Sequence, residues 1–431
     1  MNTLARIAAS ARRAPILTAL LLAACGGNPP KESAAVVGAL RIALAPHEGT
    51  TAVDEQIREV QARVKERVDV PRLERLATLY IGKARGSGDP GYYRLAEASA
   101  DAMPQDGGGQ HAAMLVRGHV RHALHDFAAA ETIARRLVAE RGMFLDHGLL
   151  GDVLLDLGRL EEARDVYQRM LDLKPCLQSY ARAAHVRWLV GDIAGSRELL
   201  HMAASAGSHR DPESMAWVLA RRATLELQAN DAETALTYAD AALERVVDHP
   251  QALLARGRAL LALGDATQAE ASLGKAVACY PLPEYLWAHA DALRAGGREG
   301  DAARVEADLL RTGEREDPRT FAAWLATTGQ HPETALRLAE AEFRIRQDAL
   351  TADVLAAARV RMGDYSGAAT AMQQALAVGP ADARVRLHAA MVDIARGESG
   401  VAGSHLAAAD AARAALLPSE RALLADLRRR L

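Results

Sequence analysis

Apolar and polar positions between residues 144 and 175 follow the spacing of two amphipathic helices that flank a short polar turn. The turn is Gly158-Arg159, and Pro175 closes the unit. Apolar side chains recur three or four residues apart, at Leu150, Val153, Leu154 and Leu157 before the turn and at Ala163, Val166, Tyr167, Met170 and Leu171 after it. Side chains at this spacing share one face of a helix. The segment therefore predicts a helical hairpin in which two apolar faces pack together.

The same unit recurs along most of the chain. Equivalent turn residues lie 32 to 39 residues apart, at His125, Gly158, Gly191, Asn230, Gly264, Gly297, Gly329, Gly363 and Gly397. An alanine follows each turn, at Ala130, Ala163, Ala235, Ala269, Ala302, Ala335, Ala368 and Ala402, and Ser196 takes its place once. A single hairpin cannot bury its apolar face alone, so neighbouring hairpins must stack into one continuous core. We therefore expect an all-α solenoid, with its regular array at residues 107–417.

The flanking segments predict how this array begins and ends. Residues 53–106 carry helical apolar stripes around a longer, glycine-rich turn, and they predict an atypical N-terminal repeat segment. Residues 418–431 place Leu423, Leu424 and Leu427 on one stripe of a charged helix. A terminal repeat needs one apolar face and one polar face exposed to solvent, so this segment predicts a capping helix.

The spacing within the unit resembles the tetratricopeptide repeat. That repeat has a period of 34 residues, with a small residue near position 8, a turn glycine near 15, an alanine near 20 and a proline near 32. Gly151, Gly158, Ala163 and Pro175 match these positions in the unit that begins at residue 144. The resemblance implies a right-handed solenoid of tandem helical hairpins that binds a protein or peptide partner and is not an enzyme.

The resemblance also implies where the partner binds. In this family the first helix of each hairpin lines a concave groove through positions 2, 5, 9, 12 and 13. In this register, those positions hold His119, His122, Asp152, Asp156, His185, Trp188, Trp217, Arg258, Trp287, Asp291 and Arg294. Tryptophan and arginine are frequent anchors of protein interfaces. The alternative is that the tryptophans fill spaces between helices. The lysine and asparagine set of the chaperone-tail-binding members is not visible, so that ligand is not implied.

The N-terminus has the pattern of an export signal. Three arginines precede an apolar run of 11 residues at 14–24, which suits a signal-peptide core and is too short to span a bilayer. The ending Leu22-Ala23-Ala24-Cys25 resembles the lipobox of bacterial lipoproteins. This resemblance implies removal of residues 1–24 and lipidation of Cys25. The alternative is an ordinary secretory signal followed by an accidental cysteine.

The residues after Cys25 bear on where the protein resides. Residues 25–52 begin with a run rich in glycine and proline, and they predict a flexible tether. Gly26 stands where an inner-membrane retention signal usually has Asp, so the lipoprotein resemblance favours the periplasmic face of an outer membrane. We expect membrane attachment through the N-terminal lipid only, since no second apolar run reaches about 20 residues. The sequence does not indicate an oligomeric state.

Composition and motifs narrow the classes of function. The chain has 52 basic and 55 acidic residues, with no basic stripe, so nucleic acid is not an expected partner. The sequence contains no phosphate-binding loop, zinc-protease pair or nucleophile elbow, and we expect no cofactor and no catalytic residue. His119 and His122 share a helix face, but further metal ligands are not evident, so no metal is assigned. Two alternatives remain: a structural accessory subunit of an envelope assembly or secretion complex, and a metal-binding module around these histidines.

Overall fold

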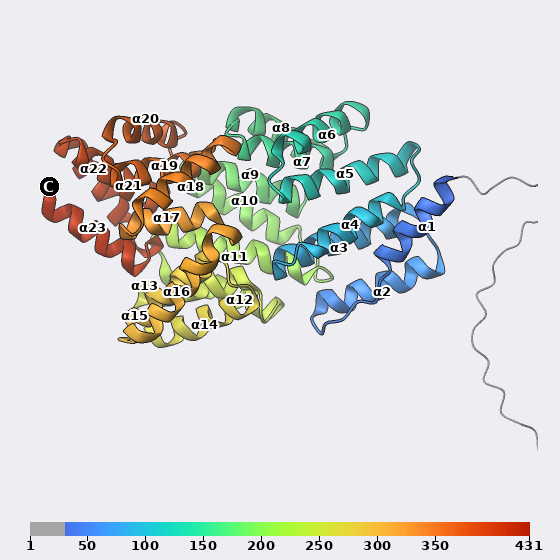
Figure 1. Cartoon of the computed structure of the whole chain (residues 1–431), viewed down its shortest axis with the longest axis horizontal. Coiled ribbons are helices and arrows are strands. Elements are labelled where there is room, and N and C mark those ends of the chain that lie inside the picture. The colour runs from blue at the N-terminus through green and yellow to red at the C-terminus, as the bar shows by residue number, and fades with distance from the viewer. Residues whose placement is uncertain (1–30) are drawn as a thin grey trace, which may run out of the picture.

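The computed structural model describes residues 31–431, which form 23 α-helices and no strand (Figure 1). The predicted signal peptide and Cys25 lie outside the described residues. Four helices precede the regular array: α1 (Lys31–Ala43), α2 (Ala52–Glu66), α3 (Val70–Ser87) and α4 (Gly91–Asp101). None of the helices between residues 31 and 431 combines the length and apolar character needed to cross a membrane.

Nine hairpins make up the array within the described residues. Their first helices are α5 (Gly107–Ala123), α7 (Phe144–Asp156), α9 (Leu177–Leu189), α11 (Pro212–Gln228), α13 (Pro250–Leu263), α15 (Pro283–Ala295), α17 (Pro318–Thr328), α19 (Ala349–Arg361) and α21 (Ala383–Ala395). Their second helices are α6 (Phe127–Glu140), α8 (Leu160–Leu173), α10 (Ile193–Ser205), α12 (Ala232–Arg245), α14 (Ala266–Cys279), α16 (Glu299–Glu316), α18 (Pro332–Ile345), α20 (Tyr365–Leu376) and α22 (Ser399–Ala411). A short 3-10 turn, η1 (Arg413–Ala415), and α23 (Pro418–Arg430) end the chain. The all-α solenoid predicted from the sequence is confirmed.

The turn residues adopt the backbone conformation that the repeat requires. All nine have positive φ, from 60° at His125 to 87° at Gly264, and each lies just after the first helix of its hairpin. This left-handed conformation ends a helix and is open to glycine without a steric penalty. The eight alanines after the turns are fully buried and Ser196 is 2% exposed. The predicted register is therefore confirmed.

Small side chains let the two helices of a hairpin approach closely. In the hairpin of α7 and α8, a Cβ at Gly151 would lie 2.3 Å from Tyr167 Cε1. Ala163 is buried in the same hairpin. Because any larger side chain at Gly151 would collide with the Tyr167 ring, the ring fixes the distance between the helices.

The array curls until distant repeats meet across its interior. Gln228 Nε2 on α11 donates to Asp382 Oδ2 at 2.9 Å, although the two residues are 154 positions apart. Arg346 Nη2 donates to Asp156 Oδ1 at 2.8 Å. A Cβ at Gly158 would lie only 2.3 Å from Gln347 O. The inner surface of the solenoid is therefore partly enclosed by its own C-terminal repeats.

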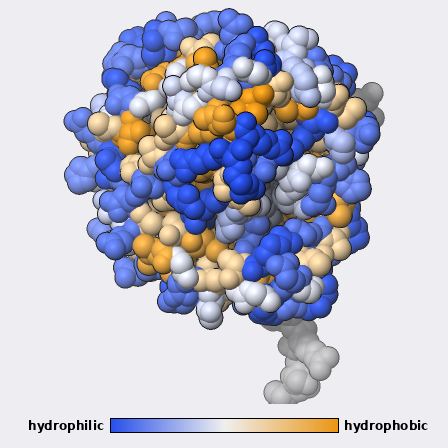
Figure 2. Space-filling model, turned by 90° about the vertical axis from the view of Figure 1, so that its left-hand side faces the viewer, coloured by the Kyte–Doolittle hydropathy of each residue, from blue (hydrophilic) through white to orange (hydrophobic). Residues whose placement is uncertain are grey.

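The last helix covers part of this inner surface. Leu423, Leu424 and Leu427 of α23 are buried, as the capping prediction requires. The wet face of α23 carries a run of exposed arginines at 428–430. Figure 2 views the molecule from the end that carries α23, and hydrophilic side chains cover much of that face, with hydrophobic side chains in smaller patches. The helix therefore closes the core at this end of the array.

The predicted tether differs from the structure over much of its length. Residues 31–43, within the range predicted as flexible, form α1, and Ala39 and Ala43 are buried in the N-terminal core. The carbonyl oxygen of Ala43 accepts a hydrogen bond from Tyr80 Oη at 2.6 Å. Gln61 Nε2 also donates to it, at 3.3 Å. Buried side chains of α2 and α3 thus hold a segment whose own sequence shows no clear helical period.

Candidate binding cavity

Two adjoining chambers occupy the interior of the curled array. The outer chamber, of about 730 Å³, is lined mainly by α5, α7, α9 and α11 and includes His122, Asp152, Asp156 and Trp217. The inner chamber, of about 270 Å³, is lined by α9 and α11 on one side and α17, α19 and α21 on the other. His185 and Arg221 line both chambers. First helices therefore supply most of the lining, as the resemblance implies for a concave binding surface.

The position of α9 explains why side chains gather at the junction of the chambers. Ala181, His185 and Trp188 follow one another at spacings of four and three residues, so they lie on one face of the helix. The rings of His185 and Trp188 stack with centroids 5.3 Å apart. Burial, and then the charge of Arg221, lower the pKa of His185 to about 3. His185 is therefore neutral at pH 7, and its Nδ1 accepts a hydrogen bond from Arg221 Nη2 at 3.0 Å.

Charges in the outer chamber are paired with one another. Arg182 donates two hydrogen bonds to the carboxylate of Asp152, both at 2.7 Å, and Tyr167 Oη donates a third at 2.8 Å. Burial alone would raise the pKa of Asp152, but the Arg182 guanidinium holds it well below its usual range. Such a bidentate pair is among the stronger polar interactions in proteins.

Asp156, one helical turn further along α7, is the second paired carboxylate. His122 Nε2 lies 2.8 Å from Asp156 Oδ2, and Arg346 donates to the other oxygen. Burial would raise the pKa of Asp156, and the hydrogen bond from His122 and the charge of Arg346 outweigh it, so the pKa is lowered. This cluster joins α5 and α7 to the loop before α19, and it therefore stabilises the curved arrangement of the array.

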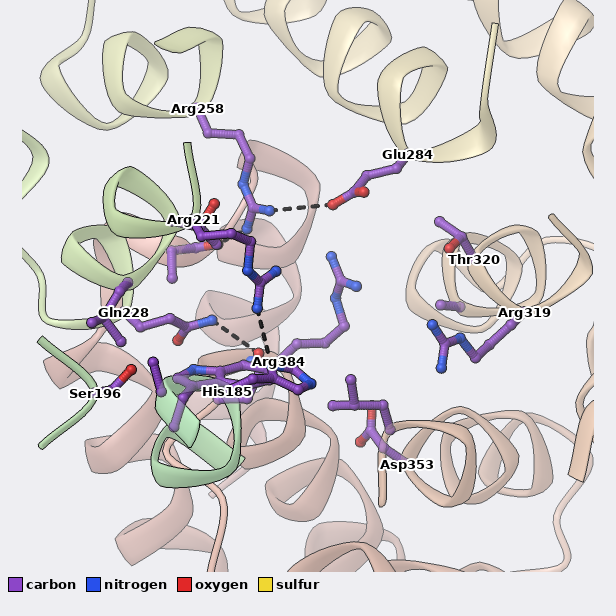
Figure 3. A pocket seen from close by; sticks show the side chains of 18 of the residues that line it. His185, Ser196, Arg221, Gln228, Arg258, Glu284, Arg319, Thr320, Asp353 and Arg384 are labelled. Carbon is purple, nitrogen blue, oxygen red and sulfur yellow. Dashed lines mark hydrogen bonds and ion pairs between the residues drawn. The ribbon is translucent and has the colours of Figure 1, made fainter. Parts of the chain in front are cut away.

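The inner chamber is rich in arginine. Figure 3 shows Arg221, Arg258, Arg319 and Arg384 pointing into it from four different helices. Arg258 Nη2 donates to the backbone oxygen of Ala415 at 2.6 Å, and its Nη1 lies 3.5 Å from Glu284. Arg384 pairs with Glu420 and lies over the ring of Trp287, 4.7 Å from its centroid. Arg221 has no carboxylate oxygen within 4 Å in the described part of the chain, and Arg319 lies 3.6 Å from Asp348 Oδ1 without a hydrogen bond.

The structure brings most of the predicted groove residues to this cavity. The predicted residues that line a chamber are His122, Asp152, Asp156, His185, Trp188, Trp217 and Arg258. His119 is half-buried on α5 outside the lining, and burial lowers its pKa to about 3. The role of these eight residues in partner binding remains a prediction.

Three predicted residues are not in an open groove. Trp287 and Asp291 are 1% and 2% exposed, because α23 packs over them. Trp287 Nε1 donates to Ser419 Oγ at 2.9 Å, and Asp291 accepts from Ser419 N and Oγ at 3.0 and 2.6 Å. Arg294 lies outside the chambers and pairs with Glu299 and Glu306. The groove prediction was therefore wrong for Trp287 and Asp291, because the terminal helix fills that part of the inner surface, whereas Arg294 is 39% exposed and its role stays a prediction.

Three arginines of the inner chamber, Arg221, Arg319 and Arg384, were absent from the predicted set. Arg319 is at position 5 of its repeat and Arg384 at position 2 of a later one, counted back from the turns at Gly329 and Gly397. The repeat register therefore already places Arg319 and Arg384 at groove positions. Arg221 is at position 6 of its repeat, outside the positions considered, and only the curl of the array brings it into the lining.

Few clusters of side chains among residues 31–431 resemble a metal site or a catalytic site. No group of three or more His, Cys, Asp or Glu side chains there could hold a metal ion. Thr327 Oγ1, His388 and Asp353 form a hydrogen-bonded chain, with distances of 3.3 Å and 3.0 Å. Thr327 and His388 are only 4% and 0% exposed, so no substrate reaches them. This chain links α17, α21 and α19 within the core.

Stacked helical hairpins around an enclosed inner surface define the class of helical-repeat interaction scaffolds. The family model of the tetratricopeptide repeat matches residues 111–175 and 220–282, so these two segments carry tetratricopeptide repeats. Proteins of this family are in general non-catalytic scaffolds. No curated protein matches the sequence.

The solved structures that the chain matches have low sequence identity to it. A tetratricopeptide repeat protein from Parabacteroides merdae is 13% identical, with a TM-score of 0.38, and the match covers 66% of this chain and 99% of that one. Rap protein complexed with competence and sporulation factor is 14% identical, with a TM-score of 0.47 and coverage of 75% and 98%. The APC/C hetero-tetramer Cut9-Hcn1 is 14% identical, with a TM-score of 0.36 and coverage of 90% and 98%.

Proposed function

We propose that this protein is a lipid-anchored scaffold that binds a protein or peptide partner in the two chambers and holds it at a membrane surface. The observation that carries the proposal is the cavity itself. It combines a preformed concave surface with exposed aromatic area, since Trp217 is 36% exposed at the outer chamber. Ligand sites are usually concave, with apolar walls and a few fixed polar groups. Binding is reversible recognition with no covalent step, and the protein is not an enzyme.

The anchor in this proposal is an acylated Cys25 at the periplasmic face of the outer membrane. The sequence Leu22-Ala23-Ala24-Cys25 and the glycine at position 26 support it. Only residues 26–30 separate Cys25 from α1. Five residues span at most about 18 Å when fully extended. The helical body would therefore lie close to the bilayer, and a captured partner would be held there too.

Fractionation and affinity capture test both parts of the proposal. The protein, expressed with its own signal, is recovered from membranes and from the soluble fraction, and co-purifying proteins are identified by mass spectrometry. We expect the wild type in the membrane fraction and the Cys25→Ala form in the soluble fraction. If the two forms fractionate alike, the lipid anchor is refuted.

A matched pair of aromatic substitutions tests the cavity. Trp217→Ala removes an exposed ring from the outer chamber, and Tyr365→Ala removes a ring of similar exposure, 45%, from α20 on the outside of the array. We expect Trp217→Ala to weaken partner capture and Tyr365→Ala to leave it unchanged. The reverse result would favour the second candidate, an accessory subunit of an envelope complex that uses its convex face.

A further inference from the structure

Two arginines of the inner chamber stand out because their guanidinium groups form no hydrogen bond to an oxygen acceptor among residues 31–431. Arg221, on α11, has no carboxylate oxygen within 4 Å among residues 31–431, and its side-chain hydrogen bond goes to His185. Arg319, on α17, has its nearest carboxylate oxygen, Asp348 Oδ1, at 3.6 Å, and it forms no hydrogen bond within the described chain. Figure 3 shows both groups pointing into the chamber from opposite walls.

The other two arginines of the chamber do donate to oxygen acceptors, although Arg258 Nε has no hydrogen-bond partner in the described chain. Arg384 is paired with Glu420 and lies over Trp287. Arg258 contacts a backbone oxygen and Glu284. Each of these arginines also joins separate parts of the array, since Glu420 and Ala415 belong to the C-terminal end. Arg221 and Arg319 make no comparable link, and this leaves their donors available to a ligand.

A cation in a partly enclosed site without a counter-charge is unfavourable. Removing a charged group from water carries a large free-energy cost unless hydrogen bonds and an opposite charge replace the water. Burial lowers the pKa of Arg221, and the more distant Glu284 offsets only part of that effect. The neighbouring His185 is neutral and supplies no negative charge. Burial would lower the pKa of Arg319, but the charges of Asp348 and Asp317 outweigh it and raise that pKa. The cation without a compensating charge is therefore Arg221, and an incoming anion is favoured beside it.

The surroundings indicate which anion fits. Arginine presents a planar fork of donors that matches a carboxylate. Glu284, Asp353 and Asp382 line the same chamber, so a group with one negative charge meets less repulsion than a doubly charged phosphate. Thr320 lines the chamber beside Arg319, but its hydroxyl already donates to Asp317 Oδ2 at 2.6 Å, so the arginines are the donors that remain for a ligand.

We propose that the inner chamber binds the carboxylate group of a ligand between Arg221 and Arg319. The ligand is the end of a peptide chain that enters through the outer chamber, or a free small organic acid. This inference rests on the proposed function, since the same cavity receives the partner. It adds the chemical group that the deepest part of the cavity recognises.

Calorimetric titration of the detergent-solubilised full chain tests the inference at constant ionic strength. The probes are N-acetyl-trialanine with a free carboxylate, its carboxamide, propionate and inorganic phosphate. We expect the peptide acid to bind and the carboxamide to bind at least ten-fold more weakly. Binding of propionate with the same affinity would identify a free organic acid as sufficient, and its failure to bind would identify a peptide end. Equal binding of acid and carboxamide, stronger binding of phosphate, or no binding of any probe would overturn the inference.

Variants locate the binding. We expect Arg221→Gln and Arg319→Gln each to weaken binding of the peptide acid at least ten-fold. Arg311→Gln, which changes a 69% exposed arginine on α16, is the matched control and should bind as the wild type does. Without ligand, Arg221→Gln should melt no lower than the wild type, because it removes an unpaired cation. A clearly lower melting temperature would show that Arg221 has a structural role and would count against the inference.

The outcomes separate this inference from the proposed function. If Arg221→Gln captures the macromolecular partner as well as the wild type and no acid binds, the carboxylate site is refuted and the scaffold remains. If the peptide acid binds in an Arg221-dependent way but no partner is captured from membranes, the scaffold is refuted and the carboxylate site remains.

Discussion

Asp152 and Asp291 occupy the same position in their repeats, six residues before the turn glycine, yet their surroundings differ completely. Asp152 lies in the outer chamber, where Arg182 and Tyr167 donate to it. Asp291 lies beneath α23, where its hydrogen-bond donors are the backbone N and the hydroxyl group of Ser419. The pKa of Asp152 is held far below its usual range, whereas burial raises the pKa of Asp291 to about 6.

The difference shows what the repeat register determines and what it leaves open. The register turns both side chains toward the inside of the solenoid. The partner of each side chain is set by which distant segment arrives there as the array curls. Near α7 the interior stays open and its charges are paired by neighbouring repeats. Near α15 the terminal helix fills the interior, and the inward-facing residues become core.

The largest expected effect on stability is for a substitution in the region that α23 covers. Trp287→Ala would leave a large void beneath α23, because Trp287 is among the largest fully buried side chains of the protein. Replacing a buried aromatic ring by alanine costs roughly 3–5 kcal/mol. We expect a loss of that order in the free energy of unfolding, measured by urea denaturation. A loss below about 1 kcal/mol would show that α23 does not pack there in solution.

A smaller effect on stability is expected from breaking the Arg182–Asp152 pair in the outer chamber. Arg182→Gln would leave Asp152 with Tyr167 as its remaining hydrogen-bond donor. An unsatisfied, largely buried polar group costs about 1–3 kcal/mol, and the partial exposure of this pair argues for the lower half of that range. Thermal and urea unfolding would measure the loss. An unchanged stability would mean that water replaces the arginine without cost.

Asp291→Asn should act in the opposite direction and depend on pH. The folded-state pKa of about 6 exceeds the ordinary value of 3.8, so the folded chain holds the proton more tightly than the unfolded chain. The contribution of Asp291 to stability is therefore complete below about pH 4 and is lost as pH rises through 6. We expect Asp291→Asn to match the wild type near pH 4 and to be more stable at pH 7, by on the order of 1–2 kcal/mol.

The control for this experiment is the aspartate on the open side. Asp152→Asn removes a carboxylate whose pKa is lowered, so it should be less stable than the wild type at pH 7. Opposite signs for the two substitutions would confirm that position alone does not fix the environment. The same sign for both would contradict the comparison.

The smallest effect on stability is expected for Trp217→Ala. Its ring is 36% exposed at the outer chamber, unlike the buried ring of Trp287. Exposed substitutions usually change stability by no more than about 0.5 kcal/mol. We expect an almost unchanged urea midpoint, which would make any loss of partner capture in this variant a direct effect on binding. A loss of several kcal/mol would instead place Trp217 in the core.

Local and periodic features were predictable from the sequence, because they depend on contacts within and between neighbouring hairpins. The nine turn residues, the buried alanines and the capping helix all follow from helical spacing and a repeat of about 34 residues. Helix α1 was not predicted, because Tyr80 and Gln61, on other helices, anchor its end.

The closure of the interior was also not predictable. The bond between Gln228 and Asp382 spans 154 positions and depends on small rotations accumulated over several repeats. The total rotation over several repeats cannot be read from the local sequence pattern of any one repeat. The same closure buries Trp287 and carries Arg221 into the chamber, so the groove prediction was wrong at one end and incomplete at the centre. Arg319 and Arg384 occupy positions 5 and 2 of their repeats, so the repeat register alone is sufficient to predict them.

The most direct test of the central claim is site-specific photo-crosslinking in intact cells. A photoreactive residue replaces either Gln178, which is exposed and lines the outer chamber, or Tyr365, which is exposed on α20 outside it. The account predicts a discrete crosslinked partner from position 178 and none from position 365. A partner that crosslinks from position 365 and never from position 178 would contradict the claim that this protein binds its partner inside the curled array.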